Sequence, residues 1–147
     1  LESVKYALPS TNEIAQTVQV MSRQVDFIYV PLDNTIANAM QTVVKEANKA
    51  NIPVIPSVDT MVEQGGLATI GINQYQLGLQ SGKMAAELAS GKEKPETTPV
   101  YTFDQGDTVI NQSQADRLGI IVPQSMKEKA KIITDDSQQE TSKEDDK

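Results

Sequence analysis

The sequence predicts an α/β fold, in which a parallel sheet carries flanking helices. Short runs of apolar and β-branched residues alternate with segments whose apolar residues recur at helical spacing. The first strand, helix and strand fall within about thirty residues, the size of a βαβ unit with its right-handed crossover. A chain of 147 residues, 38% of them hydrophobic, suffices for one core, either alone or as half of a larger protein.

The first two elements are a helix and a strand. Residues 10–13 have the spacing of a capping box, and Ile14, Val18 and Met21 follow at helical spacing. The nearly continuous apolar run over residues 25–30 predicts a strand that is covered on both faces.

A second helix and strand follow. After Asn34 the apolar residues form one helical stripe, made of Ile36, Met40, Val43 and Ala47. Residues 52–56 then predict a short strand with proline near its ends.

The middle of the chain predicts a strand and a long helix. The strand covers Leu67 to Ile72, and the helix runs from about Tyr75 to Ser90. Gly78 and Gly82 lie four residues apart in this helix, which predicts close backbone packing against a neighbouring element.

The remainder predicts two strands, over residues 100–103 and 108–110, and two helices. One helix opens at Asn111 and closes at Gly119, and the last runs from residues 123–125 through Ile133.

Charge and composition exclude several functions. The net charge of -7, from 20 acidic and 13 basic residues, does not fit a nucleic-acid partner. Without histidine or cysteine, the chain lacks imidazole bases, thiolate nucleophiles and the usual zinc or iron ligands, so we expect no metal or cofactor. Residues 134–147 hold six of the acids and no apolar periodicity, which predicts a disordered acidic tail.

No stretch reaches the roughly 18 to 20 apolar residues of a membrane span, and no signal segment opens the chain. Because the sequence begins at Leu1 without a methionine, we expect it to be a mature or truncated piece.

Polar clusters follow the predicted strands. In open α/β sheets, ligands bind outside the carboxyl ends of the strands, where loops lead into helices. Asp33 and Asn34 follow the first strand, Asp59 follows the second, and Thr11 and Asn12 stand at a helix start. Such residues either cap helices or present a fixed anion and amide to a ligand ammonium. Spacing alone favours the cap for Asp33.

Three stretches together resemble the second half of a known family. They are VDFIYVPLDNTIANAM, ANIPVIPSVDTMVEQGGLATIGINQYQLGLQSGKMAAELASGK and VINQSQADRLGIIVPQSM. Their order is similar to that in bacterial ABC-transporter substrate-binding lipoproteins of the periplasmic-binding-protein type I group, in particular members associated with aromatic amino acids. The resemblance covers residues 3–133.

The resemblance implies a two-lobed protein that closes on a small ligand, delivers it to a membrane permease and performs no covalent chemistry. Residues 1–133 would be its carboxy-terminal half, with residues 68–94 belonging to the amino-terminal lobe. Asp33 and Asn34 would face the cleft, with Thr11, Asn12 and Asp59 nearby. The protein would be extracytoplasmic, at the cell surface or in the periplasm, and tethered as a lipoprotein.

The missing half leads us to expect one of three outcomes for the isolated chain. The helix within residues 68–94 packs back on its own sheet, is exchanged with a second copy in a dimer, or makes the chain poorly soluble.

Two alternatives stay open. The same fold could bind a sugar or a purine, with Phe27, Tyr29, Tyr75, Tyr101 and Phe103 available to stack on a ring, although strand aromatics are more often core. A doubly wound enzyme or signalling domain would instead use Asp26, Asp33 or Asp59 as a reactive carboxylate. Against this, no acidic pair follows the first strand.

Overall fold

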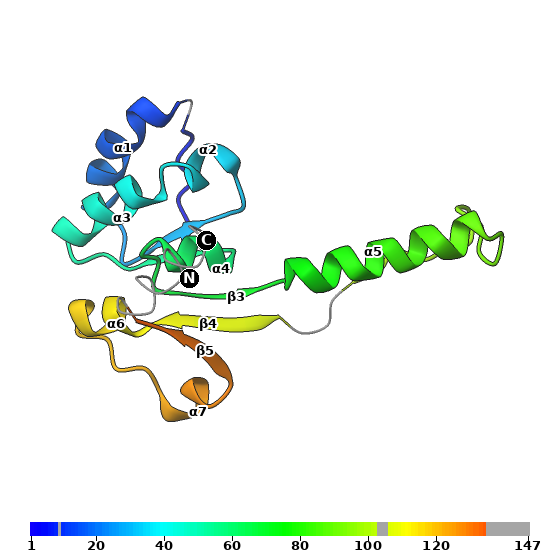
Figure 1. The fold of residues 1–147 in the computed structure, drawn as a ribbon. Coiled ribbons are helices and arrows are strands. Elements are labelled where there is room, and N and C mark those ends of the chain that lie inside the picture. Colours follow the sequence, from blue (N-terminus) through cyan, green and yellow to red (C-terminus); the bar gives the residue numbers. More distant parts are fainter. Residues whose placement is uncertain (9, 103–105, 135–147) are drawn as a thin grey trace, which may run out of the picture.

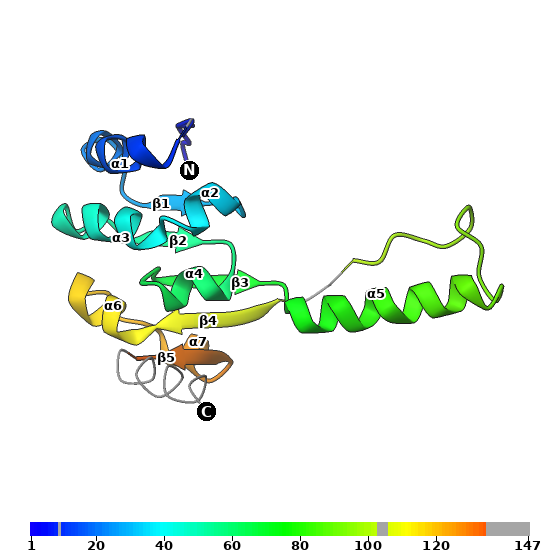
Figure 2. The same ribbon diagram turned by 45° about the horizontal axis from the view of Figure 1, so that its top comes forward.

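The predicted α/β fold is confirmed by a computed structural model that describes residues 1–8, 10–102 and 106–134. Its strands form two hydrogen-bonded groups, ordered β1-β2 and β3-β4-β5. The strands are β1 (Ile28–Val30), β2 (Val54–Pro56), β3 (Ala68–Gly71), β4 (Asp107–Asn111) and β5 (Ala130–Ile133). The Leu67 amide donates to the Val54 carbonyl at 2.7 Å, so the two groups lie side by side, as Figure 2 shows.

Most of the strand pairing is parallel, as the sequence predicts. Strand β1 pairs in parallel with β2, and β4 pairs in parallel with β5. The exception is β3 with β4, which are antiparallel because a long excursion of the chain separates them and returns it in the opposite direction.

Helices flank these strands, and one helix extends away from them (Figure 1). They are the 3-10 turn η1 (Thr11–Glu13), α1 (Ile14–Met21), α2 (Asn34–Ala37), α3 (Met40–Lys49), α4 (Asp59–Glu63), α5 (Gln74–Ala89), α6 (Gln112–Leu118) and α7 (Gln124–Lys127). Helix α1 packs on α3, α4 contacts β2, β3 and β4, and α6 and α7 contact β5.

The predicted apolar stripes build the core. Ile14 and Val18 of α1 are buried together with Met40, Val43 and Ala47 of α3. Their partners on the strands are Ile28, Val30 and Val54. The helix predicted after Asn34 is interrupted at Ala39, where the backbone leaves helical geometry, and continues as α3.

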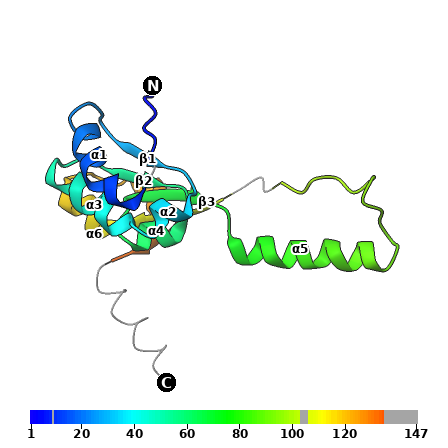
Figure 3. The ribbon, with the colours of Figure 1, turned by 90° about the horizontal axis from the view of Figure 1, so that it is seen from above.

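Helix α5 projects from the body as an arm, as three views show (Figures 1, 2 and 3). None of its residues is buried. A Cβ atom at Gly78 or Gly82 would meet nothing within 4 Å, so the expected close packing at these glycines is absent. The expectation that this helix packs back on its own sheet is therefore wrong for this structure.

Three local predictions are wrong. The Ser10 hydroxyl donates to the Glu13 carboxylate at 3.4 Å and caps no backbone amide, so the capping box is absent although the helix follows. Strand β1 is covered on one face only, because α1 and α3 bury Ile28 and Val30 while Tyr29 is 61% exposed. Residues 100–102 form no strand, and residue 103 lies outside the described residues.

The end of the chain is partly as predicted. Helix α6 opens at Asn111, whose side chain accepts from the Gln114 amide at 2.9 Å, and closes at Gly119 with a φ of 67°. The last predicted helix stops after one turn, at Lys127. The β-branched residues near Ile133 pair with β4 instead, which buries Ile133. The predicted disorder of the acidic tail concerns residues outside the described ranges, except Thr134.

Glu46 joins α1 to α3 through a carboxylate that is only 8% exposed. Lys49 donates to it at 2.7 Å and Gln19 at 2.9 Å. The hydrogen bond from Lys49, and then that from Gln19, lowers the pKa of Glu46 below its ordinary 4.5, against the opposing effect of burial.

This lowered pKa predicts a pH-dependent contribution to stability. The contribution is complete above the pKa of the unfolded chain and is lost as the pH falls through the lower folded value. We expect Glu46→Gln to reduce the free energy of unfolding near neutral pH, and the difference from wild type to shrink at about pH 2. Urea unfolding at both pH values measures this, with the exposed Glu2→Gln as control. If the unfolding free energies of Glu46→Gln and wild type differed by the same amount at both pH values, this prediction would be contradicted.

Within the part of the chain that the structure describes, no helix combines the length and apolar character needed to cross a membrane.

Candidate ligand-binding site

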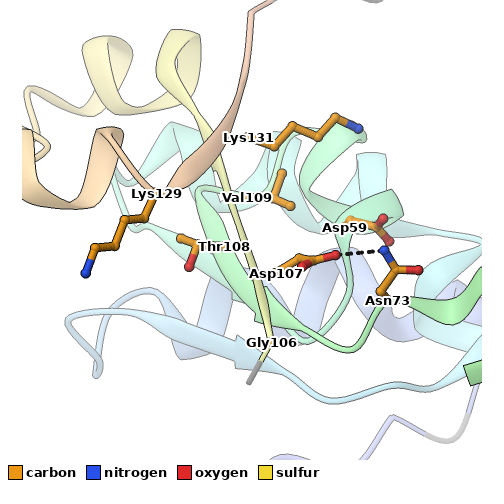
Figure 4. A pocket seen from close by; sticks show the side chains of 8 residues that line it. All are labelled: Asp59, Asn73, Gly106, Asp107, Thr108, Val109, Lys129 and Lys131. Atoms are coloured by element: carbon orange, nitrogen blue, oxygen red, sulfur yellow. Dashed lines mark hydrogen bonds between the residues drawn. The ribbon is translucent and has the colours of Figure 1, made fainter. Parts of the chain in front are cut away.

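A polar hollow of about 350 Å³ lies where the arm leaves the body (Figure 4). It is lined by Asp59, Asn73, Gly106, Asp107, Thr108, Val109, Lys129 and Lys131. Most of these side chains carry a charge or a hydrogen-bonding group, which suits a small polar or zwitterionic ligand.

Three acidic or amide side chains gather on one side of the hollow (Figure 4). Asp59 is the first residue of α4, just after β2, and Asp107 is the first residue of β4. Asn73 stands between β3 and α5, where its Oδ1 accepts from the Gln76 amide at 3.0 Å. Its Nδ2 donates to the Asp107 carboxylate at 2.8 Å. The Asp59 carboxylate accepts from the Thr60 amide at 2.9 Å.

Within the described residues, no hydrogen bond joins Lys129 or Lys131 to this group. Lys131 donates to Glu63 at 3.1 Å, which directs its charge toward α4. Figure 4 shows Lys129 on the far side of the hollow from Asp59 and Asn73. The side around Asp59 is therefore rich in hydrogen-bond acceptors and suits a ligand ammonium group.

The structure brings Asp59, alone of the predicted site residues, into this hollow. Asp33 caps α2, accepting from the amides of Thr35 at 2.8 Å and Ile36 at 3.1 Å. Asn34, Thr11 and Asn12 are exposed and do not line the hollow. Because β1 and β2 are parallel, the loops that hold Asp33 and Asp59 nevertheless open at the same edge of the sheet.

The sequence reasoning missed Asn73 and Asp107. Asn73 carries the same signal as Asp33, a capping residue between an apolar run and a helix. Asp107 gives no such signal, because its place in the hollow depends on the antiparallel pairing of Gly71 with Asp107.

The other candidate groups are dispersed. Asp26 precedes β1 and so lies at the opposite end of that strand from Asp33. The described residues contain no group of three or more acidic side chains placed to hold a metal ion.

Four of the five aromatic side chains named as candidates for stacking are described, and none of the four is core. Phe27, Tyr29, Tyr75 and Tyr101 are between 38% and 72% exposed, contrary to the usual place of strand aromatics. Phe103 lies outside the described residues. Tyr75 stands two positions after Asn73, at the start of the arm.

Comparisons with known proteins agree with the resemblance. The family model described as ABC transporter substrate binding protein matches residues 1–133. A curated tyrosine-binding protein of Clostridioides difficile (strain R20291) is 35% identical over 111 residues, which are 76% of this chain and 32% of that protein.

Solved structures match over most of the chain. An ABC domain in complex with L-Trp, from Streptococcus pneumonia, is 46% identical, with a TM-score of 0.82 over 90% of this chain and 45% of that chain. A conserved domain protein of Vibrio cholerae is 30% identical, with a TM-score of 0.77, covering 89% of this chain and 44% of that one. A ligand-free, open substrate-binding protein with adhesive properties, from Clostridium difficile, is 34% identical, with a TM-score of 0.71, covering 89% and 43%.

The chain thus spans less than half the length of each of these relatives. The family model nevertheless covers most of the chain, and a polar hollow lies at the edge of its sheet. This chain belongs to the ABC transporter substrate-binding protein family.

Proposed function

We propose that this chain is the carboxy-terminal half of the solute-binding component of an ABC importer, and that the whole protein binds an amino acid between two lobes. The observation that carries the proposal is the group formed by Asp59, Asn73 and Asp107 at the hollow. Relatives named for L-Trp and tyrosine support an aromatic amino acid as the ligand.

The proposed chemistry is ionic and hydrogen-bonded. Asp59 accepts from the α-ammonium group of the ligand, because a fixed carboxylate in a partly enclosed site favours a charged donor. The side-chain amide of Asn73 is hydrogen-bonded at both ends, to the Asp107 carboxylate and to the Gln76 amide. Its dipole therefore has a fixed orientation toward a ligand in the hollow. Tyr75, 72% exposed and close in sequence, is available to contact a ring.

We also propose that residues 68–94 belong to the amino-terminal lobe of the whole protein. Helix α5 supports this, since it has no buried residue and exposes Tyr75, Leu77 and Leu79. A preceding half of the protein would cover these side chains and fill the open space beside Gly78 and Gly82.

Other parts of the proposal concern the whole protein. It is extracytoplasmic, at the cell surface or in the periplasm, tethered as a lipoprotein, and it delivers its ligand to a membrane permease without covalent chemistry. Four further residues would lie at the rim of the cleft, outside the hollow: Asp33, Asn34, Thr11 and Asn12.

For the isolated chain we propose a dimer that exchanges the arm. Within one copy no residue of α5 is buried, and Tyr75, Leu77 and Leu79 are exposed. Size-exclusion chromatography with light scattering should give a mass that rises with concentration, whereas a monomer at all concentrations would contradict the exchange.

Calorimetric titration tests the ligand proposal. The protein is the chain joined to the residues that its gene encodes before Leu1, called the joined protein below. We expect one of tryptophan, tyrosine or phenylalanine to bind, and leucine and ribose to bind more weakly or not at all. A folded joined protein that binds ribose or a purine but no amino acid would contradict the proposal.

A further inference from the structure

The base of the arm lies where α5 leaves β3. Helix α5 has no buried residue, so none of its sixteen residues is packed in the core of the body. Leu79, in the middle of the helix, is 53% exposed. Within the described residues, the contacts that could fix the arm's direction are therefore those where it leaves β3 and where the chain returns to β4.

The two connections approach each other closely at this base. Gly71 and Asp107 form the last paired positions of β3 and β4. A Cβ atom on Gly106 would lie 2.9 Å from the Gly71 carbonyl oxygen and 2.8 Å from Ile70. Only a glycine fits there without a shift of the backbone.

One side chain joins these connections beyond the last paired position. The Oδ1 atom of Asn73 accepts from the Gln76 amide and so holds the first turn of α5. Its Nδ2 atom donates to the Asp107 Oδ2 at 2.8 Å and so holds the start of β4. The amide of Asn73 thus links the arm to the body with both of its ends.

We propose that Asn73 and Asp107 form a clasp that fixes the direction of the α5 arm relative to the hollow, with Asp107 as a positioning residue. The clasp holds Asn73 in one orientation at the wall of the hollow. A ligand at Asn73 would contact the residue that also sets the direction of the arm. This ligand contact, unlike the clasp itself, rests on the function proposed above. Ligand occupancy and lobe orientation would then be coupled through one amide.

Spin labels can measure the direction of the arm directly, because the sequence contains no cysteine. Labels on Lys45→Cys in α3 and Ala86→Cys in α5 span the body and the arm, and both positions are exposed. We expect double electron–electron resonance on the 147-residue chain at low concentration to give one narrow distance peak. We expect Asp107→Ala to lose that peak and give a broad distribution.

Three further variants separate the clasp from other effects. Asp107→Asn keeps an acceptor oxygen for Asn73 and should retain the narrow peak. Asn73→Asp keeps the acceptor for the Gln76 amide but has no donor for Asp107, so it should lose the peak even though the helix remains capped. Asp116→Ala breaks a side-chain bond to Gln112 on α6, far along the chain from the arm, and should leave the peak unchanged.

A narrow peak that survives in both Asp107→Ala and Asn73→Asp would overturn the proposal, as would a broad distribution in the wild type. If circular dichroism shows that Asp107→Ala does not fold, the distance distributions of Asn73→Asp and Asp107→Asn test the clasp instead. The proposal then requires a broad distribution in Asn73→Asp and a narrow peak in Asp107→Asn. The measurement uses no ligand, so its failure is distinct from a failure of the joined protein to bind amino acids.

Discussion

Asp59→Ala is expected to weaken amino-acid binding by the joined protein by about 2 to 5 kcal/mol, which is roughly thirtyfold to several-thousandfold in Kd. Asp59 is the half-buried carboxylate of the hollow, and its removal would leave a ligand ammonium without its counter-charge. The loss should be largest for ligands with a free α-amino group, and an N-acetylated amino acid should bind weakly to both proteins. Calorimetric titration of wild type and variant measures the effect.

Asp33→Ala is the matched control. Asp33 accepts two backbone amides at the start of α2, so its loss should cost about 0.5 to 2 kcal/mol of unfolding free energy. The Kd for the ligand should change much less than in Asp59→Ala. The opposite pattern, in which Asp33→Ala removes binding and Asp59→Ala does not, would place the anchor at Asp33 and exclude the hollow as the site.

Met61→Ala is expected to lower the free energy of unfolding by about 2 to 5 kcal/mol. Met61, in α4, is 0% exposed and belongs to the core cluster that joins the helices to β1 and β2. The truncation would remove buried apolar contacts and leave a cavity that this close-packed layer cannot fully close. Urea unfolding followed by circular dichroism measures the change.

Met126→Ala makes the same chemical change on α7, where the side chain is 43% exposed. It should alter the unfolding free energy by less than about 0.5 kcal/mol, as surface substitutions usually do. Equal losses in the two variants would contradict the assignment of Met61 to the core.

Regular periodicity explains why most of the body could be predicted from the sequence. Ile14 and Val18, and Met40, Val43 and Ala47, form stripes that two elements bury against each other. Asn111 and Gly119 carry chemistry specific to the start and the end of a helix, and they delimit α6 as expected.

The predictions about the last helix and about the burial of β1 are wrong for the same physical reason, which is that tertiary contacts decide both features. The β-branched pair at Ile132 and Ile133 follows a helical turn, and only pairing with β4 makes this segment a strand. The apolar run around Tyr29 predicts a buried strand residue. Tyr29 is nevertheless exposed, because the helices α1 and α3 cover only the opposite face of β1.

The residues of the hollow also differ in whether a local sequence pattern or a tertiary contact places them there. Asp59 was predictable because it follows a strand and begins a helix, which is a local pattern. Asp107 was not, because it reaches the hollow through an antiparallel pairing across the whole α5 excursion. The cap formed by Asp33 and the ligand anchor proposed for Asp59 cannot be told apart by spacing, since both are carboxylates at helix starts.

A crystal structure of the joined protein with the amino acid that binds most tightly in calorimetry would locate the ligand directly. We predict that its α-ammonium group lies within hydrogen-bonding distance of the Asp59 carboxylate and near Asn73, with α5 packed in the other lobe. A ligand bound away from the hollow, or an α5 helix that still projects into solvent, would contradict the account.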